Sequence, residues 1–308
     1  MGGNDSSDSP NAYAGHAPDV HNGGMNIDAL RVCLSALAVF LVTWAPILPA
    51  QSEGNDYIRH AADKNGAPQA LEVSITGFEN GQGVRVDLVG AIHVADRRYF
   101  GDLDRRLADY EVVLYELVGE PGQVTAPRSG SPSMIGLMQG GMKNALGLAF
   151  QLDEIDYGRD NMVHADLTPS AFAASMRDRN ESFLGMIFRA WAMALAEQGS
   201  GKAAGQDAAF IKALFANDRQ LALKRVLAEQ LSSQTELLES LAGDDGSTLI
   251  TVRNQRALEV LREQLDAGAR DIAIFYGAGH MPDFETRLVD DFGMRRVSTE
   301  WIEAWDLR

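Results

Sequence analysis

The chain has 308 residues, 45% of them hydrophobic and 23% charged, with a formal net charge of −16 and a single cysteine, Cys33. This length and composition are typical of a globular protein with one large domain or two small ones. The acidity argues against nucleic acid or an anionic membrane surface as the main partner, because both require clustered cations. One cysteine excludes an internal disulfide framework and any paired-cysteine zinc or redox site.

The amino-terminal part has the composition of a leader rather than of a folded domain. Residues 1–24 lack apolar periodicity, which predicts a disordered segment or a start further along, at Met25. Residues 32–50 are uncharged and end in prolines and a small residue, so we interpret residues 25–50 as a signal peptide of a secreted, periplasmic or cell-envelope protein. The alternative is an uncleaved membrane anchor, since the run is about long enough to span a bilayer. Cys33 lies in this run, so the remaining chain has no thiol.

After a polar lead-in at residues 51–70, residues 71–308 are predicted to form one α/β domain. Its first part alternates β-rich apolar runs with a segment whose apolar residues recur at helical spacing. A strand, a helix and a second strand in this order imply a parallel pair. The predicted elements are strands at residues 71–78 and 84–92, a helix at residues 94–110 and a strand at residues 111–117.

The second part, about residues 131–246, reads as a large helical insertion. Thr168 followed by Pro169 is typical of a helix start, because threonine caps a first turn and proline fits its first position. The α/β alternation then returns, with a helix at residues 247–267, a strand at 271–276, a helix at 283–292 and a strand at 295–305. We therefore predict an α/β fold, a central mixed, partly parallel sheet with flanking helices and a large helical insertion.

Two predicted strands share one local plan, in which an apolar strand runs into G-A-x-H. The first ends in Gly90 and His93, and the second in Gly277 and His280. In open α/β sheets ligands bind at the carboxyl ends of parallel strands, so neighbouring strands would bring both imidazoles to one crevice. Glycine allows a tight turn or close approach of a ligand. Glu116 lies near the end of the apolar strand at residues 111–117, where a carboxylate is costly to bury unless it is paired or ligating.

Two histidines and a carboxylate suit a divalent metal such as zinc, manganese or cobalt, or a proton-transfer pair without metal. Arg253 is predicted either to hold Glu116 or a substrate carboxylate, or to be a surface arginine. Asn254 lies on the apolar stripe of its helix, so we expect it to be buried with partners. His164 with Asp166 either completes a ligand set or caps the helix that starts at Thr168. His60, in the polar lead-in, is predicted to be solvated.

These motifs together resemble the TraB/PrgY/GumN family, which is related to the TIKI metalloproteases. The resemblance covers residues 71–308 and rests on the runs LVGAIHVADRRYFGDLDRRLADYEVVLYEL, VRNQR and FYGAGHMPDFETRL. It implies an α/β core with helical insertions, similar to the erythromycin-esterase and haem-binding ChaN folds, and a metal-dependent protease activity that prefers manganese or cobalt. The family's motif residues match Gly90, His93, Glu116, Arg253, Asn254, Gly277 and His280. An acidic residue often precedes the RN pair in the family, and Val252 stands there here.

The sequence therefore predicts an exported, metallopeptidase-like hydrolase that acts on a peptide or another small substrate. His93 and His280 would bind the metal or act on water directly. Glu116 would be a further ligand or the general base, and Arg253 would orient it or stabilise developing negative charge. His164 would be an additional ligand, and Gly90, Gly277, Gly279 and Asn254 would line the ligand site.

The alternative function is binding without turnover. The same crevice would then sequester a peptide, as proposed for pheromone-shutdown relatives, or a haem, as in ChaN-like proteins. A ligand-binding histidine and a catalytic one have the same sequence pattern, so both functions remain open at this point.

Overall fold

The structure is a computed structural model that describes residues 57–122, 146–179, 181, 202–233 and 247–308. The chain divides into two compact units, and all described residues belong to the second, Leu37–Arg308. The predicted disordered segment, the signal peptide or membrane anchor, and parts of the helical insertion therefore lie outside the described residues. No helix within the described ranges is long and apolar enough to cross a membrane.

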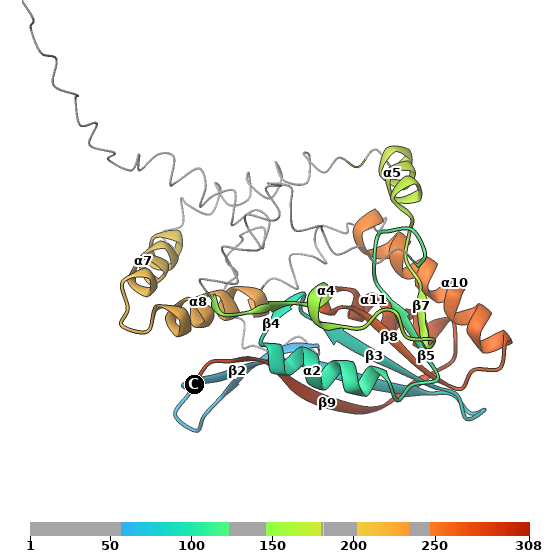
Figure 1. Cartoon of the computed structure of the whole chain (residues 1–308), viewed down its shortest axis with the longest axis horizontal. Helices are drawn as coiled ribbons and strands as arrows, with labels where there is room; N and C mark the ends of the chain where they lie inside the picture. Colours follow the sequence, from blue (N-terminus) through green and yellow to red (C-terminus); the bar gives the residue numbers. More distant parts are fainter. Residues whose placement is uncertain (1–56, 123–145, 180, 182–201, 234–246) are drawn as a thin grey trace, which may run out of the picture. The chain divides into compact units, whose positions relative to one another are not determined.

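The described domain is built on a seven-stranded sheet in the order β1-β2-β3-β8-β5-β7, with β9 paired to β2 (Figure 1). Strands β3, β8, β5 and β7 run parallel, whereas β1, β3 and β9 each pair antiparallel with β2. The predicted mixed, partly parallel sheet is confirmed. The strands are β1 (Ile58–Ala62), β2 (Pro68–Glu79), β3 (Arg85–Ala91), β5 (Val112–Tyr115), β7 (Met162–His164), β8 (Asp271–Gly277) and β9 (Arg295–Asp306). A second, two-stranded sheet pairs β4 (Val94–Ala95) with β6 (Ala149–Phe150).

Three features of the sheet differ from the sequence prediction. Strand β7 belongs to the main sheet, although it lies within residues 131–246, which were predicted as a helical insertion. Strand β8 inserts between β3 and β5, so the predicted strand–helix–strand unit holds a parallel pair that is not adjacent. Strand β1 lies in the predicted polar lead-in, where His60 pairs opposite Leu71 of β2. His60 is half-buried, and its Nε2 is shielded from solvent without a hydrogen-bond partner among the described residues, so the prediction that His60 is solvated holds only in part. Backbone pairing along β2 overrides the polar composition of this short edge strand.

Helices flank the sheet, as predicted. The α2 helix buries Tyr99, Phe100, Leu103 and Leu107, which recur at the spacing of one helix face. Thr168 caps α5 by accepting a hydrogen bond of 3.2 Å from the backbone N–H of Ala171. The helices are α2 (Arg97–Leu107), α4 (Gln151–Glu154), α5 (Pro169–Asp178), α7 (Lys202–Leu214), α8 (Arg219–Ser233), α10 (Arg253–Asp266) and α11 (Met281–Asp290). A π-helical turn, η1 (Thr248–Val252), precedes α10, and a 3₁₀ turn, η2 (Ala278–His280), precedes α11.

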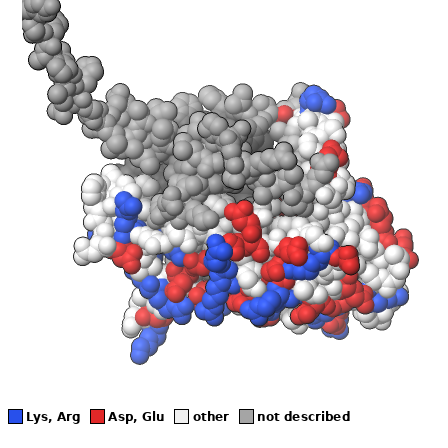
Figure 2. All heavy atoms as spheres, viewed as in Figure 1, with Lys and Arg blue, Asp and Glu red and all other residues white. Residues whose placement is uncertain are grey.

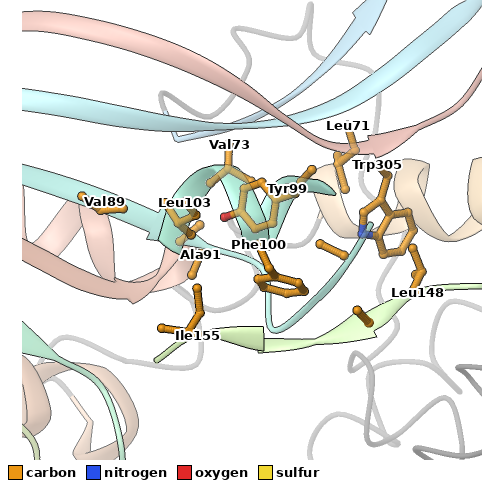
Figure 3. Packing of buried hydrophobic residues seen from close by; sticks show 14 of the residues in the cluster. Leu71, Val73, Val89, Ala91, Tyr99, Phe100, Leu103, Leu148, Ile155 and Trp305 are labelled. Carbon is orange, nitrogen blue, oxygen red and sulfur yellow. The ribbon is translucent and has the colours of Figure 1, made fainter. Parts of the chain in front are cut away.

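The core consists of two apolar clusters. Alternate residues of β3 enter different clusters, with Val89 in the first and Leu88 in the second. Figure 3 shows the first cluster, where Tyr99 and Phe100 of α2 pack near Trp305 of β9. Each fully buried aromatic or leucine side chain contributes about 1.5–3 kcal/mol. Because apolar layers cover both faces of the central strands, those strands read as continuous apolar runs.

The surface carries both signs of charge. Figure 2 shows Lys and Arg side chains interspersed with Asp and Glu side chains over the described residues of the face in view. Some of these groups are paired, for example Arg106 with Glu300, which links α2 to β9 at 2.6 Å. Exposed pairs of this kind contribute about 0–1 kcal/mol each, so the fold depends on the two apolar clusters rather than on this surface.

Candidate functional site

The two G-A-x-H strand ends lie side by side. Strand β3 pairs in parallel with β8, which places Ala91 opposite Gly277. Strand β5 pairs with the other side of β8, with Tyr115 opposite Phe275. The carboxyl ends of three parallel strands therefore meet at one edge of the sheet, which is where open α/β sheets bind ligands. The two strands are neighbours, which was the condition for bringing both histidines to one edge, and Glu116 follows the third strand at the same edge.

Glu116 is the carboxylate at the centre of this edge, and its side chain is 9% exposed. One oxygen, Oε2, accepts a hydrogen bond of 2.6 Å from the backbone N–H of Gly277. The other, Oε1, accepts one of 2.6 Å from Nη2 of Arg253 and lies 3.6 Å from Nε2 of His280. Burial by itself would raise the pKa of Glu116, but Arg253, followed by His280 and His93, holds that pKa well below its usual range. The carboxylate is therefore ionised at neutral pH.

Arg253 is buried between two carboxylates. Its Nε and Nη2 atoms donate hydrogen bonds of 2.9 and 2.6 Å to the two oxygens of Asp166, whose side chain is fully buried. Its Nη2 atom also donates to Glu116. Burial opposes the charge of the guanidinium, yet Glu116 and Asp166 raise the pKa of Arg253 above its ordinary value. Of the predicted roles, holding Glu116 is confirmed and a surface position is wrong. Asp166 binds Arg253, which was not among the roles predicted for it from the sequence.

His280 is buried and held by Asn254. Its Nδ1 atom lies 2.6 Å from Oδ1 of Asn254, and the Nδ2 atom of the same amide donates to the His280 carbonyl and to Asp283. Two acceptors around Nδ2 fix the orientation of the amide, so Oδ1 accepts and Nδ1 of His280 carries the proton. Nε2 keeps its lone pair and lies 3.5 Å from Nη1 of Arg253. Asn254 is buried with partners, as predicted.

The environment of His280 favours its neutral form. Burial and the nearby charge of Arg253 lower the pKa to about 4, although Glu116 acts in the opposite direction. A neutral imidazole whose Nδ1–H is held by an amide oxygen presents an unprotonated Nε2, which is the form that accepts a proton or binds a metal.

His93 is exposed, in contrast to His280. Its Nδ1 atom lies 3.0 Å from Oε1 of Gln151, and Nε2 of the same glutamine donates to the hydroxyl of Tyr157 at 2.8 Å. Nε2 of His93 points towards Gly277, where an added Cβ would lie 3.3 Å from it and 3.2 Å from Oε2 of Glu116. Gly277 is therefore the position at which imidazole and carboxylate approach the backbone closely.

Gln151 and Tyr157 were not predicted as site residues, because both lie in the region predicted as an insertion. His164, Gly90 and Gly279, which were also predicted as site residues, make other contacts. Nε2 of His164 donates to the carbonyl of Leu117 at 2.7 Å, outside this group of side chains. A Cβ at Gly90 would lie 2.9 Å from Val73, so this glycine serves the close approach of strands. Gly279 lies in the 3₁₀ turn η2.

The donor atoms fit a metal poorly as they stand. No group of three His, Cys, Asp or Glu side chains within the described ranges could hold a metal ion. Both oxygens of Glu116 already accept short hydrogen bonds, and the guanidinium of Arg253 lies beside Nε2 of His280. A divalent cation would have to displace this guanidinium. The predicted divalent metal (manganese, cobalt or zinc) stays a prediction.

Comparison with known proteins found no matching family model, curated protein or solved structure. The resemblance to the TraB/PrgY/GumN family therefore stays a prediction from the motifs.

Proposed function

We propose that the protein is a hydrolase that cleaves a carbonyl ester or amide bond of a peptide or another small substrate. One observation carries this proposal. Two imidazoles from separate strand ends each have Nδ1 beside an amide oxygen. Nε2 of His280 lies 3.6 Å from Glu116, which is paired with Arg253, and Nε2 of His93 faces Gly277 beside the same carboxylate. Unprotonated imidazole nitrogens beside a fixed anion and a fixed cation supply a base, charge compensation and an oxyanion donor in one place.

His93 is the base in this proposal because its ring is exposed and a substrate can reach it. Nε2 of His93 takes a proton from a water molecule, whose oxygen attacks the substrate carbonyl. The imidazolium returns this proton to the departing oxygen or nitrogen when the carbonyl re-forms and the scissile bond breaks. Glu116, near Nε2 of His93, stabilises the imidazolium between these two steps.

Arg253 and His280 form the buried side of the site. Within the described ranges, the Nη1 atom of Arg253 makes only long contacts of 3.5 Å, to the Leu249 carbonyl and to Nε2 of His280. It is therefore the donor left for the oxyanion of the tetrahedral intermediate, and such a donor is worth about 10²–10³ in rate. Neutral His280 lies beside Nη1 of Arg253. The guanidinium therefore has no further charged neighbour among the described residues besides Glu116 and Asp166.

The test is a screen of the purified full-length protein against peptide and ester libraries, analysed by mass spectrometry. Each reaction is run with a chelator and with added manganese, cobalt or zinc. Cleavage that is lost in His93→Ala and His280→Ala variants of unchanged circular dichroism supports the proposal. Cleavage that also requires added metal, with metal bound in calorimetry, supports the metal-dependent form. Equal rates of cleavage with chelator and with added metal support a metal-independent hydrolase.

A binding protein would give a different result. It would protect a peptide or a haem from a second reagent, and no product would form with any metal. That outcome would replace the hydrolase with the sequestering function. We also propose that the protein is exported through the predicted signal peptide at residues 25–50, which lies outside the described ranges. Amino-terminal sequencing of protein recovered outside the cytoplasm tests cleavage near residue 50.

A further inference from the structure

Gln151 contacts His93 at two points. Its backbone N–H donates to the carbonyl of His93 at 2.9 Å, and its side-chain oxygen faces Nδ1 of the same residue at 3.0 Å. Gln151 begins helix α4, directly after strand β6, whose partner β4 begins one residue after His93. The small β4–β6 sheet therefore fixes the distance between the glutamine and the exposed imidazole.

Tyr157 closes the other end of this chain of hydrogen bonds. Its hydroxyl accepts a hydrogen bond of 2.8 Å from Nε2 of Gln151. Gln151 is 5% exposed and Tyr157 is 8% exposed, so water does not replace either partner freely. The ring of Tyr157 also packs edge-on against Tyr115, at 5.0 Å between ring centroids, which anchors it to strand β5. The chain from Tyr157 through Gln151 to His93 is thus buried at one end and exposed at the other.

We propose that Gln151 and Tyr157 are positioning residues that keep the proton of neutral His93 on Nδ1 and leave Nε2 free for the reaction. The consequence for activity rests on the proposed function, whereas the location of the proton does not. Gln151 is held by the main chain at one end and by Tyr157 at the other, and its oxygen is the acceptor for Nδ1–H. Groups that hold the second nitrogen of a metal-ligating histidine change activity by about 10–100-fold when removed, and we expect an effect of this size at His93.

The equivalent amide at the other histidine shows why both residues are needed. Nδ2 of Asn254 faces two oxygens that can only accept, so its amide has one orientation. Gln151 faces a hydroxyl, which both donates and accepts. A reversed Gln151 amide would direct its NH₂ group at Nδ1 of His93 and move the ring proton to Nε2. A glutamate at position 151, which only accepts when ionised, allows one orientation alone.

The test locates the ring protons by ¹⁵N NMR of full-length protein labelled in histidine, at a pH where both rings are neutral. His93→Ala identifies the signals of His93. In the wild type we expect a protonated Nδ1 and an unprotonated Nε2. Gln151→Leu removes the acceptor and moves part of the population to the Nε2–H form. Gln151→Glu restores the wild-type pattern, and Tyr157→Phe gives a mixture because the amide loses its buried partner.

Tyr110→Phe is the matched control. It removes a tyrosine hydroxyl that also makes a 2.8 Å hydrogen bond, to Asp87 of strand β3. Asp87 lies near the start of β3, away from the strand end that precedes His93. The His93 signals should be unchanged in this variant, and the His280 signals should be unchanged in all of them.

The outcomes separate this inference from the proposed function. An unchanged proton distribution at His93 in Gln151→Leu overturns the inference. A changed distribution without hydrolysis in any protein, wild type included, keeps the positioning role and removes the hydrolase. With an active wild type, we expect Gln151→Leu to lower the rate about 10–100-fold and Gln151→Glu to recover most of it.

Discussion

The two G-A-x-H strand ends have the same sequence plan and opposite environments. After β8 the chain continues through a 3₁₀ turn into α11, so His280 is enclosed and held by Asn254 of α10. After β3 the chain enters the two-residue strand β4 instead, and His93 stays exposed with Gln151 as its partner. A repeated motif therefore produces one histidine that belongs to the interior and one that meets the solvent. The predictions below test this division.

The largest effect should separate the two histidines by activity and stability. His93→Ala should lower hydrolysis about 10²–10⁴-fold, because it removes the proton acceptor. Its free energy of unfolding should change by less than about 1 kcal/mol, because the ring is exposed. His280→Ala should lower the free energy of unfolding by about 2 kcal/mol or more, since it empties a buried site. Urea unfolding and initial rates measure both, and equal losses of stability would contradict the division.

Arg253→Met should destabilise the protein by about 3–5 kcal/mol, because it leaves the carboxylates of Glu116 and Asp166 buried without their cation. Urea unfolding at neutral pH measures this change. The matched control is Arg106→Met, which breaks the exposed pair with Glu300 and should cost less than about 1 kcal/mol. A loss in Arg253→Met no larger than in the control would contradict the need for the guanidinium between these carboxylates.

The buried histidine should also make stability depend on pH. Its folded pKa of about 4 lies below the ordinary value of 6.5, so the unfolded chain binds the proton first as the pH falls. The contribution of neutral His280 to the free energy of unfolding, about 3 kcal/mol, is complete above pH 6.5 and is lost as the pH falls towards 4. Wild type and His280→Gln are compared by urea unfolding across this range. Between pH 6.5 and 4 the free energy of unfolding should fall less in the variant than in the wild type. Parallel plots of this free energy against pH would contradict the prediction.

The smallest effect concerns the close approach between the two strand ends. Gly277→Ala places a Cβ 3.2 Å from Glu116 and 3.3 Å from His93, so both groups must shift by a few tenths of an ångström. We expect a rate loss of about tenfold and a stability loss of about 1 kcal/mol. Gly81→Ala, where a Cβ meets nothing within 4 Å, is the matched control and should leave the rate unchanged. Equal rates in both variants would show that this approach is not needed.

Much of the fold followed from sequence patterns, for particular reasons. The spacing of Tyr99, Leu103 and Leu107 predicted the helix α2, and Thr168 with Pro169 predicted the start of α5. These are local signals that do not depend on distant residues. Strand β1 was not predicted, because its residues show no alternation of apolar and polar side chains. Its pairing with β2 makes it a strand. The insertion of β8 between β3 and β5 is likewise a matter of long-range pairing.

The candidate site divides in the same way. The sequence by itself determined that His93 and His280 follow strands, that Glu116 lies near a strand end, and that Asn254 lies on an apolar stripe, because side-chain periodicity is local. Only the tertiary structure decided that Asp166 and Glu116 share Arg253, that Gln151 and Tyr157 hold His93, and that the two histidines differ in exposure. The physical reason is that burial, hydrogen-bond partners and protonation depend on which strand ends meet, and that meeting is fixed by packing across the whole sheet.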